Sequence, residues 1–154
     1  MSSDADRNLV RLLQLASPAL PVGAFSYSQG LEAAVEAGIV HDSQSAFDWI
    51  NDLLEYSLAR MDAPLLLRAI DAWRAKNFAA AQHWNDLFLA SRETAELRAE
   101  TVQMGFSLVR LLNELAGMQT DALARLNELD EISFPAVFGF AVAQWHIPTT
   151  DALL

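Results

Sequence analysis

Residues Leu13–Glu32 read LQLASPALPVGAFSYSQGLE, and this stretch sets how the chain begins to fold. It holds two of the five prolines and two of the six glycines. Because proline fixes φ and lacks a backbone N–H, Pro18 and Pro21 end the preceding helix and keep the next residues extended. Gly23 and Gly30 allow conformations that a Cβ would block. The stretch therefore predicts a helix, a structured loop and a second helix that opens near residue 28.

The predicted loop carries two aromatic side chains, Phe25 and Tyr27, where a plain linker would be polar. Aromatic residues more often fill cores, whereas exposed loops often carry binding residues. The residues alone leave both interpretations open: Phe25 and Tyr27 either pack into the core or present a surface to a partner.

An apolar repeat with the helical period recurs along the whole sequence, and no alternating segment is long enough for a strand. Apolar stripes such as Phe47, Ile50, Leu54 and Leu58 predict helices with one buried face. The expected caps or first helical residues are Asp6, Ser26–Ser28, Asp42 or Ser43, Asp62 with Pro64, Asn77, Ser91, Thr120, Ser133, and Thr149 or Thr150. The sequence thus predicts an all-α, single-domain helical bundle of about eight helices over residues 1–154.

The longest helical pattern follows Ser91 and reaches Leu115. Its apolar positions cover so wide an arc that we expect a long central helix, packed on several sides. Gly105 lies inside it, where glycine costs roughly 1 kcal/mol relative to alanine. This position predicts a close approach by a neighbouring segment. Arg92 and Glu96 have the spacing of a weak ion pair on a solvated helix face.

The composition excludes several classes of protein. With 154 residues, 53% of them apolar, the chain suits one folded domain. The net charge of −10, with ten scattered basic residues, argues against binding to nucleic acid. No apolar run is long enough to span a membrane, and the polar residues 1–8 are unlike a signal peptide. The absence of cysteine excludes disulfides and thiolate sites, and fits a cytoplasmic protein.

The sequence lacks a catalytic or metal-binding constellation. The three histidines, His41, His83 and His146, are far apart and belong to no ligand motif. No P-loop, GxSxG or dinucleotide fingerprint is present. We therefore expect no enzyme activity, no cofactor and no resident metal. A small-ligand-binding or regulatory helical domain remains an alternative, and a metal-dependent helical enzyme would need paired Glu-x-x-His motifs, which are absent.

The stretch from Leu13 to Glu32 resembles the N-terminal signature of the urease accessory protein UreF family, a leucine-containing helix followed by SP-x-LP-V/I-G-x-[FY]-x-x-S-x-GLE. The matching positions are Ser17, Pro18, Leu20, Pro21, Val22, Gly23, Phe25, Ser28, Gly30, Leu31 and Glu32. Two further blocks, Ala90–Leu112 and Pro135–Trp145, are similar to the family's long central helix and its next apolar helix. The resemblance covers nearly the whole chain.

This resemblance implies a non-enzymatic assembly factor that inserts nickel into apo-urease. In the family, the protein bridges the scaffold protein UreD, also called UreH, and the GTPase UreG, and it acts as a homodimer when full length. The resemblance also implies which residues bind a partner: Gly23, Ala24, Phe25 and Ser26 in the loop, with Tyr27 and Glu32 beside them.

The C-terminal residues predict a helix that has only begun. Pro148 ends the preceding helix, and Thr149 or Thr150 can cap a new one. Because family members continue for several more helices, we expect the chain to lack C-terminal helices, including a segment used in dimer contacts. We also expect apolar faces of the long helix and of Val137–Trp145 to be left uncovered, which would favour self-association.

Overall fold

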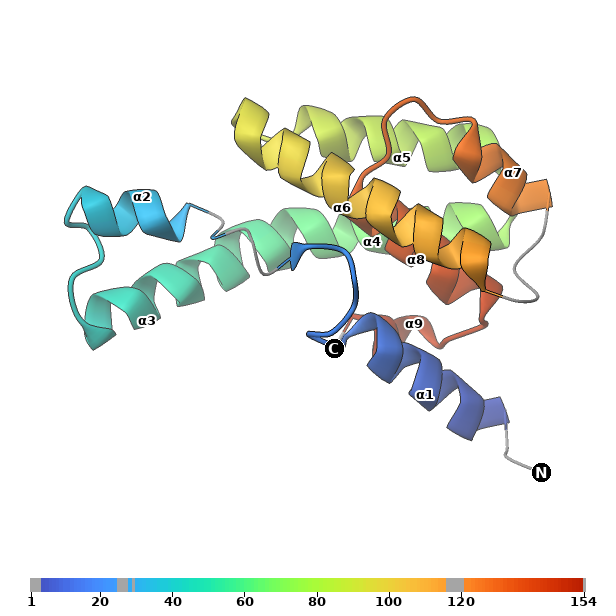
Figure 1. Ribbon diagram of the computed structural model, residues 1–154, viewed down its shortest axis with the longest axis horizontal. Helices are drawn as coiled ribbons and strands as arrows, with labels where there is room; N and C mark the ends of the chain where they lie inside the picture. The colour runs from blue at the N-terminus through green and yellow to red at the C-terminus, as the bar shows by residue number, and fades with distance from the viewer. Residues whose placement is uncertain (1–3, 25–27, 29, 116–120, 154) are drawn as a thin grey trace.

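The computed structural model describes residues 4–24, 28, 30–115 and 121–153. All regular structure among these residues is helical, which confirms the predicted all-α fold (Figure 1). The elements are α1 (Asp4–Leu15), α2 (Leu31–Glu36), α3 (Ser43–Asp52), η2 (Leu53–Asp62), α4 (Ala63–Arg74), α5 (Phe78–Ala90), α6 (Ala95–Glu114), α7 (Asp121–Asn127), α8 (Phe134–Gln144) and α9 (Thr149–Ala152).

Helices α3, η2 and α4 join end to end in one long rod (Figure 1). Its start is fixed by Asp42, whose carboxylate accepts a hydrogen bond from the Ser45 N–H at 2.8 Å. The predicted start at Asp62 with Pro64 coincides with the start of α4, whose first turn holds Pro64; Asp62 is itself helical, however, and its side chain makes no capping bond. Pro64 cannot donate to the usual helical ladder, and the π-helical hydrogen-bond pattern of η2 lies just before it.

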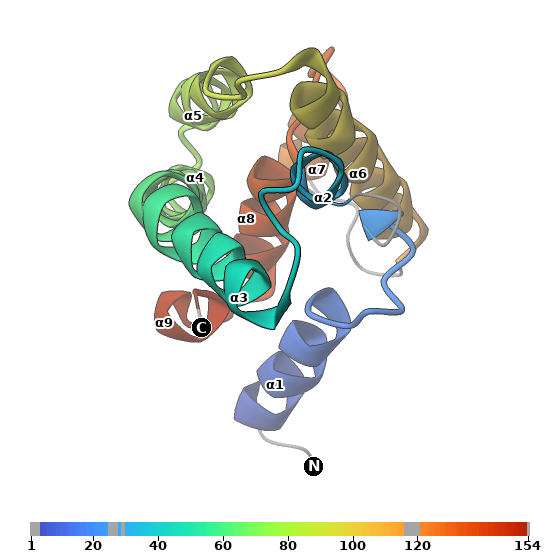
Figure 2. The ribbon, with the colours of Figure 1, turned by 90° about the vertical axis from the view of Figure 1, so that its left-hand side faces the viewer.

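Helix α8 is the most enclosed part of the bundle. It is apolar on every side; seven of its eleven residues are buried, and the other four are half-buried. It packs mainly against α4 and α6, and Figure 2 shows it between these two helices. Helix α6, with 20 residues, is the longest single α-helix of the described chain, as predicted. The expectation that Val137–Trp145 is uncovered is wrong, because α4, α5 and α6 surround this segment.

Side chains from two other helices satisfy the first N–H groups of α8. The Asn85 Oδ1 accepts a bond from the Ser133 N–H at 2.8 Å, and the Thr101 Oγ1 accepts one from the Phe134 N–H at 3.1 Å. Ser133 caps the helix through a longer bond from the Ala136 N–H at 3.4 Å. The N–H groups of Ser133, Phe134 and Ala136 therefore all have hydrogen-bond partners at this buried helix start. The bonds from Asn85 and Thr101 also fix α5 and α6 relative to α8.

The predicted close approach at Gly105 is confirmed. A Cβ at this position would overlap the backbone carbonyl of Ile132, in the segment that leads into α8. Only glycine lets α6 and this segment come so close. The helix propensity lost at Gly105 is therefore linked to the packing of α6 against the chain before α8.

Candidate partner-binding surfaces

The first part of the predicted binding loop is anchored in the core and then becomes exposed. Val22 is only 3% exposed, and Leu20 packs partly against the same core cluster. The next residue, Gly23, has φ of +79° and no neighbour that a Cβ would touch. Ala24 is exposed as well. The chain thus turns away from the core directly before the aromatic pair. Phe25, Ser26 and Tyr27 lie outside the described residues, so the two interpretations of the aromatic pair stay predictions.

Glu32, the last predicted site residue, lies exposed in the first turn of α2. The helix begins later than predicted, because Gly30 adopts a left-handed conformation with φ of +84°. The Ser28 hydroxyl accepts a long hydrogen bond, 3.5 Å, from the Glu32 N–H. A carboxylate at this end of a helix interacts favourably with the helix dipole. Gly23, Ala24 and Glu32 are therefore the exposed site residues that the structure describes, two before the aromatic pair in sequence and one after it.

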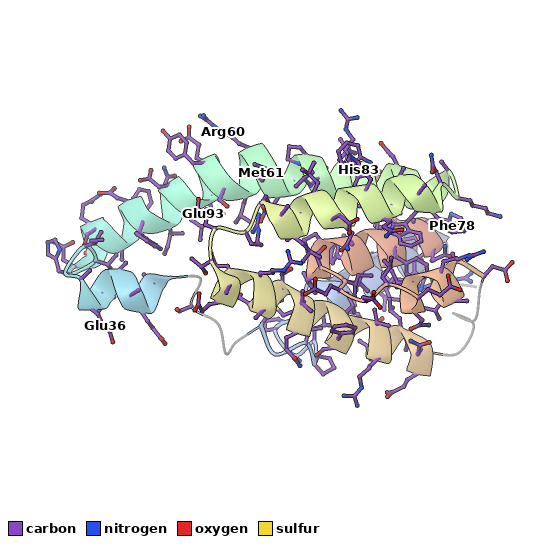
Figure 3. The ribbon with its side chains drawn as sticks, turned by 90° about the horizontal axis from the view of Figure 1, so that it is seen from above. Glu36, Arg60, Met61, Phe78, His83 and Glu93 are labelled. Atoms are coloured by element: carbon purple, nitrogen blue, oxygen red, sulfur yellow. The ribbon has the colours of Figure 1, made fainter. Side chains whose placement is uncertain are left out.

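Helices α2 and α3 form an arm, residues 31–52, that extends from the bundle with Glu36 at its far end (Figure 3). Helix α3 has no buried residue, and its Phe47 is 63% exposed. The other large apolar side chains exposed on this arm or beside it are Val35, Ile39, Ile50 and Leu54. Exposed apolar side chains in this number are typical of a surface that binds another protein.

The sequence predicted an apolar stripe on α3 but not its exposure. A helical apolar period shows that one face of a helix is buried or bound, without showing by what. Over the described part of the chain, Phe47, Ile50 and Leu54 each stay about half exposed or more. No signal within the sequence distinguishes such a stripe from one that faces the core.

A groove of about 540 Å³ lies between η2, the start of α6, α8 and α9. Its lining is mostly apolar, with Leu58, Leu66, Leu97, Met104, Phe138 and Leu153 among the residues concerned. At its polar end, Arg92 forms an ion pair with Asp62 at 2.7 Å, and both side chains are more than four-fifths buried. Arg92 therefore joins the connection between α5 and α6 to η2 rather than pairing with Glu96.

The side chain of Glu100 also lines this groove. Burial raises the pKa of its carboxyl, and the charge of Arg92 opposes that shift. A raised pKa in the folded state means that folding is favoured while the carboxyl is protonated, and that this contribution is lost as the pH rises through the folded pKa.

We therefore expect Glu100→Gln to raise the melting temperature at neutral pH. The gain should disappear below pH 4.5, the ordinary pKa of a glutamate carboxyl, because the group is then protonated in both the folded and the unfolded state. Thermal melts of both proteins across this pH range measure the difference. Glu93→Gln, an equal charge change at an exposed residue, is the control and should leave the melting temperature nearly unchanged at neutral pH. A gain from Glu100→Gln that persists unchanged at acid pH would contradict this explanation.

The histidines lie apart and exposed. His83 packs edge-on against Trp84 with ring centroids 4.9 Å apart, and His41 lies 3.7 Å from the Asp42 carboxylate. Among the described residues, no group of three His, Cys, Asp or Glu side chains could hold a metal ion. The described helices also include none that combines the length and the apolar character needed to cross a membrane.

Over the described residues, the protein is all-helical and keeps several large apolar side chains exposed on α2, α3 and η2. The UreF family model matches residues 40–154, which is most of the sequence. The chain therefore belongs to the UreF family.

Three relatives show how far the similarity extends. The urease accessory protein UreF of Azoarcus sp. (strain BH72) is 57% identical over 148 residues, which cover 94% of this chain and 63% of that protein. The UreF of Janthinobacterium sp. (strain Marseille) is 45% identical over 146 residues, 95% of this chain and 65% of the relative. The bifunctional urease accessory protein UreEF of Bordetella bronchiseptica is 51% identical over 145 residues, 94% of this chain and 34% of the relative. The chain thus spans less than two thirds of these relatives.

Proposed function

We propose that the protein is a non-enzymatic assembly factor in the maturation of urease. The main support is its membership of the UreF family together with relatives named urease accessory proteins at 45–57% identity. In this role it bridges the UreD/UreH scaffold and the UreG GTPase in the cytoplasm, engages apo-urease subunits, and acts as a homodimer when full length. Nickel is the cargo of the assembly rather than a resident cofactor of this chain.

The fused relative is consistent with this role. It is named a bifunctional urease accessory protein UreEF, and this chain spans 34% of it. Fusion of two parts in one polypeptide keeps them at a high effective concentration, as expected for components of one assembly.

Within this function, the loop with Gly23, Ala24, Phe25 and Ser26 binds the GTPase, and Tyr27 and Glu32 lie beside the contact. The core anchor at Val22 and the exposed turn at Gly23 support this assignment, because an interface aromatic residue is most effective on a rigid base. The exposed arm that follows provides a second apolar surface close in sequence.

Replacement of Phe25 with alanine tests the assignment. We expect the free energy of binding to the GTPase complex to weaken by about 2 kcal/mol, because interface aromatics are frequent hot spots. The helicity of the variant should stay nearly unchanged. Capture of the partner by the full-length protein and circular dichroism measure the two effects. Phe106→Ala removes an exposed aromatic from α6 and serves as the matched control, with binding unchanged.

The core interpretation predicts a different result for the same variant. If Phe25 is buried, its replacement should lower the free energy of unfolding by about 3–5 kcal/mol. A loss of stability on this scale, with unimpaired capture of the GTPase complex, would refute the interface assignment.

A further inference from the structure

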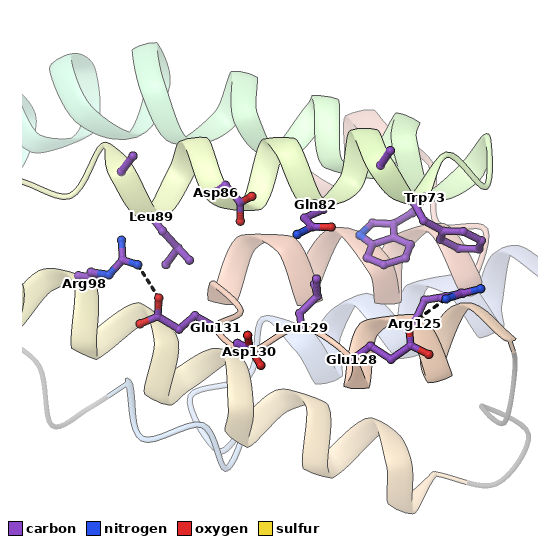
Figure 4. A pocket seen from close by; sticks show the side chains of 13 residues that line it. Trp73, Gln82, Asp86, Leu89, Arg98, Arg125, Glu128, Leu129, Asp130 and Glu131 are labelled. Carbon is purple, nitrogen blue, oxygen red and sulfur yellow. Dashed lines mark hydrogen bonds and ion pairs between the residues drawn. The ribbon is translucent and has the colours of Figure 1, made fainter.

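A groove of about 720 Å³ separates α5 from the segment that leads from α7 into α8 (Figure 4). Asn85 holds the two walls at a fixed spacing, because its Nδ2 donates to the Glu131 carbonyl at 3.0 Å and its Oδ1 accepts from the Ser133 N–H at 2.8 Å. The amide is almost completely buried. The groove is therefore preorganised, and an occupant would not have to separate these helices.

The inner surface of the groove is apolar. Trp73 is buried there with its Nε1 donating to the Ala136 carbonyl at 3.2 Å, and Phe78 packs edge-on against it with ring centroids 6.1 Å apart. Leu129 is half-buried and points across the groove toward α5 in Figure 4. This surface can accept an aliphatic or aromatic side chain from outside.

The rim of the groove is acidic in its middle. At the two ends, Arg98 pairs with Glu131 at 2.5 Å and Arg125 with Glu128 at 2.9 Å, so these charges offset one another (Figure 4).

Asp86 from α5 and Asp130 from the opposite wall lie between these pairs. Neither has an ion-pair partner within the described part of the chain; Asp86 accepts only a long hydrogen bond, 3.4 Å, from the Asn85 amide. Four carboxylates against two guanidinium groups leave the groove with a net charge of −2.

We propose that this groove binds a protein segment in which an apolar side chain is flanked by lysine or arginine. The apolar side chain covers Phe78 and Leu129, and the basic side chains lie beside Asp86 and Asp130. The negative charge of the groove disfavours nucleic acid and acidic peptides and attracts a basic segment. Gly23 and Ala24, the described residues of the predicted binding loop, do not line the groove, and the inference does not rest on the proposed function.

A labelled nine-residue peptide of sequence GRKLWLKRG serves as the probe, with binding to the full chain followed by fluorescence anisotropy. We expect saturable binding that weakens as salt is raised from about 50 to about 150 mM. The double variant Asp86→Lys with Asp130→Lys should reduce the affinity at least about tenfold, because it reverses the charge of the rim. The peptide GRKGGGKRG, which keeps the charges without the apolar anchor, should bind at least about tenfold more weakly than the probe.

The matched control changes the same number of charges away from the groove. Asp52→Lys with Asp71→Lys alters two exposed aspartates of α3 and α4, and should keep the affinity within about twofold. Thermal melts show that each variant is folded before binding is compared. The proposal is overturned by absence of binding, by an equal loss of affinity in the control variant, or by equal binding of the peptide that lacks the apolar anchor.

Discussion

Trp73→Ala is expected to lower the free energy of unfolding by about 3–5 kcal/mol. The indole is 3% exposed and packs edge-on against Phe140 of α8, with ring centroids 5.1 Å apart. Its Nε1 donates to the Ala136 carbonyl in the first turn of α8. The substitution therefore opens a cavity between α4 and α8 and leaves a buried carbonyl without this hydrogen bond.

Urea unfolding followed by fluorescence measures this effect. Trp49→Ala is the control, because Trp49 lies half-exposed on α3, a helix without buried residues. We expect it to cost roughly 1 kcal/mol or less. An equal loss for the two variants would show that the α4–α8 contact is not the centre of the core.

Asn85→Ala should lower the free energy of unfolding by about 3 kcal/mol. The side chain is 1% exposed, and its removal leaves the Ser133 N–H and the Glu131 carbonyl without their bonds from Asn85. Each buried polar group that loses its partner costs about 1–3 kcal/mol.

The same unfolding experiment measures this loss, and Asn51→Ala is its control. Asn51 lies exposed on α3, so its replacement should change stability by less than about 0.5 kcal/mol. If Asn85→Ala also stays below about 1 kcal/mol, the amide bridge between α5 and the start of α8 contributes little.

Local signals in the sequence predicted helix starts well where a cap decides them. Asp42, Asn77 and Ser133 were predicted from residue type, and each accepts a capping bond in the structure. Thr94 rather than Ser91 caps α6, since its Oγ1 accepts from the Leu97 N–H at 3.2 Å. Both residue types favour this position, so the choice depends on the path of the chain after α5.

Tertiary pairings were beyond the reach of the sequence. Arg92 pairs with Asp62 across 30 positions, and Asn85 bonds to residues 46 and 48 positions away. The helical period reports only neighbours within one or two turns, so it cannot identify such partners. For the same reason, the groove between α5 and the segment that leads from α7 into α8 could not be predicted from the sequence. The loop at Gly23 was predictable because proline and glycine act locally.

Urease maturation itself gives the most direct test of the proposed function. Urease is purified from cells that lack the gene for this protein, and from cells in which the gene has been restored as wild type or as Phe25→Ala. The nickel content per urease active site is then measured by elemental analysis. The proposed function predicts nickel-poor urease in the deletion strain, normal nickel with the wild-type gene, and nickel-poor urease with the variant at equal expression. Fully nickel-loaded urease in the deletion strain would contradict a role for this protein in urease assembly.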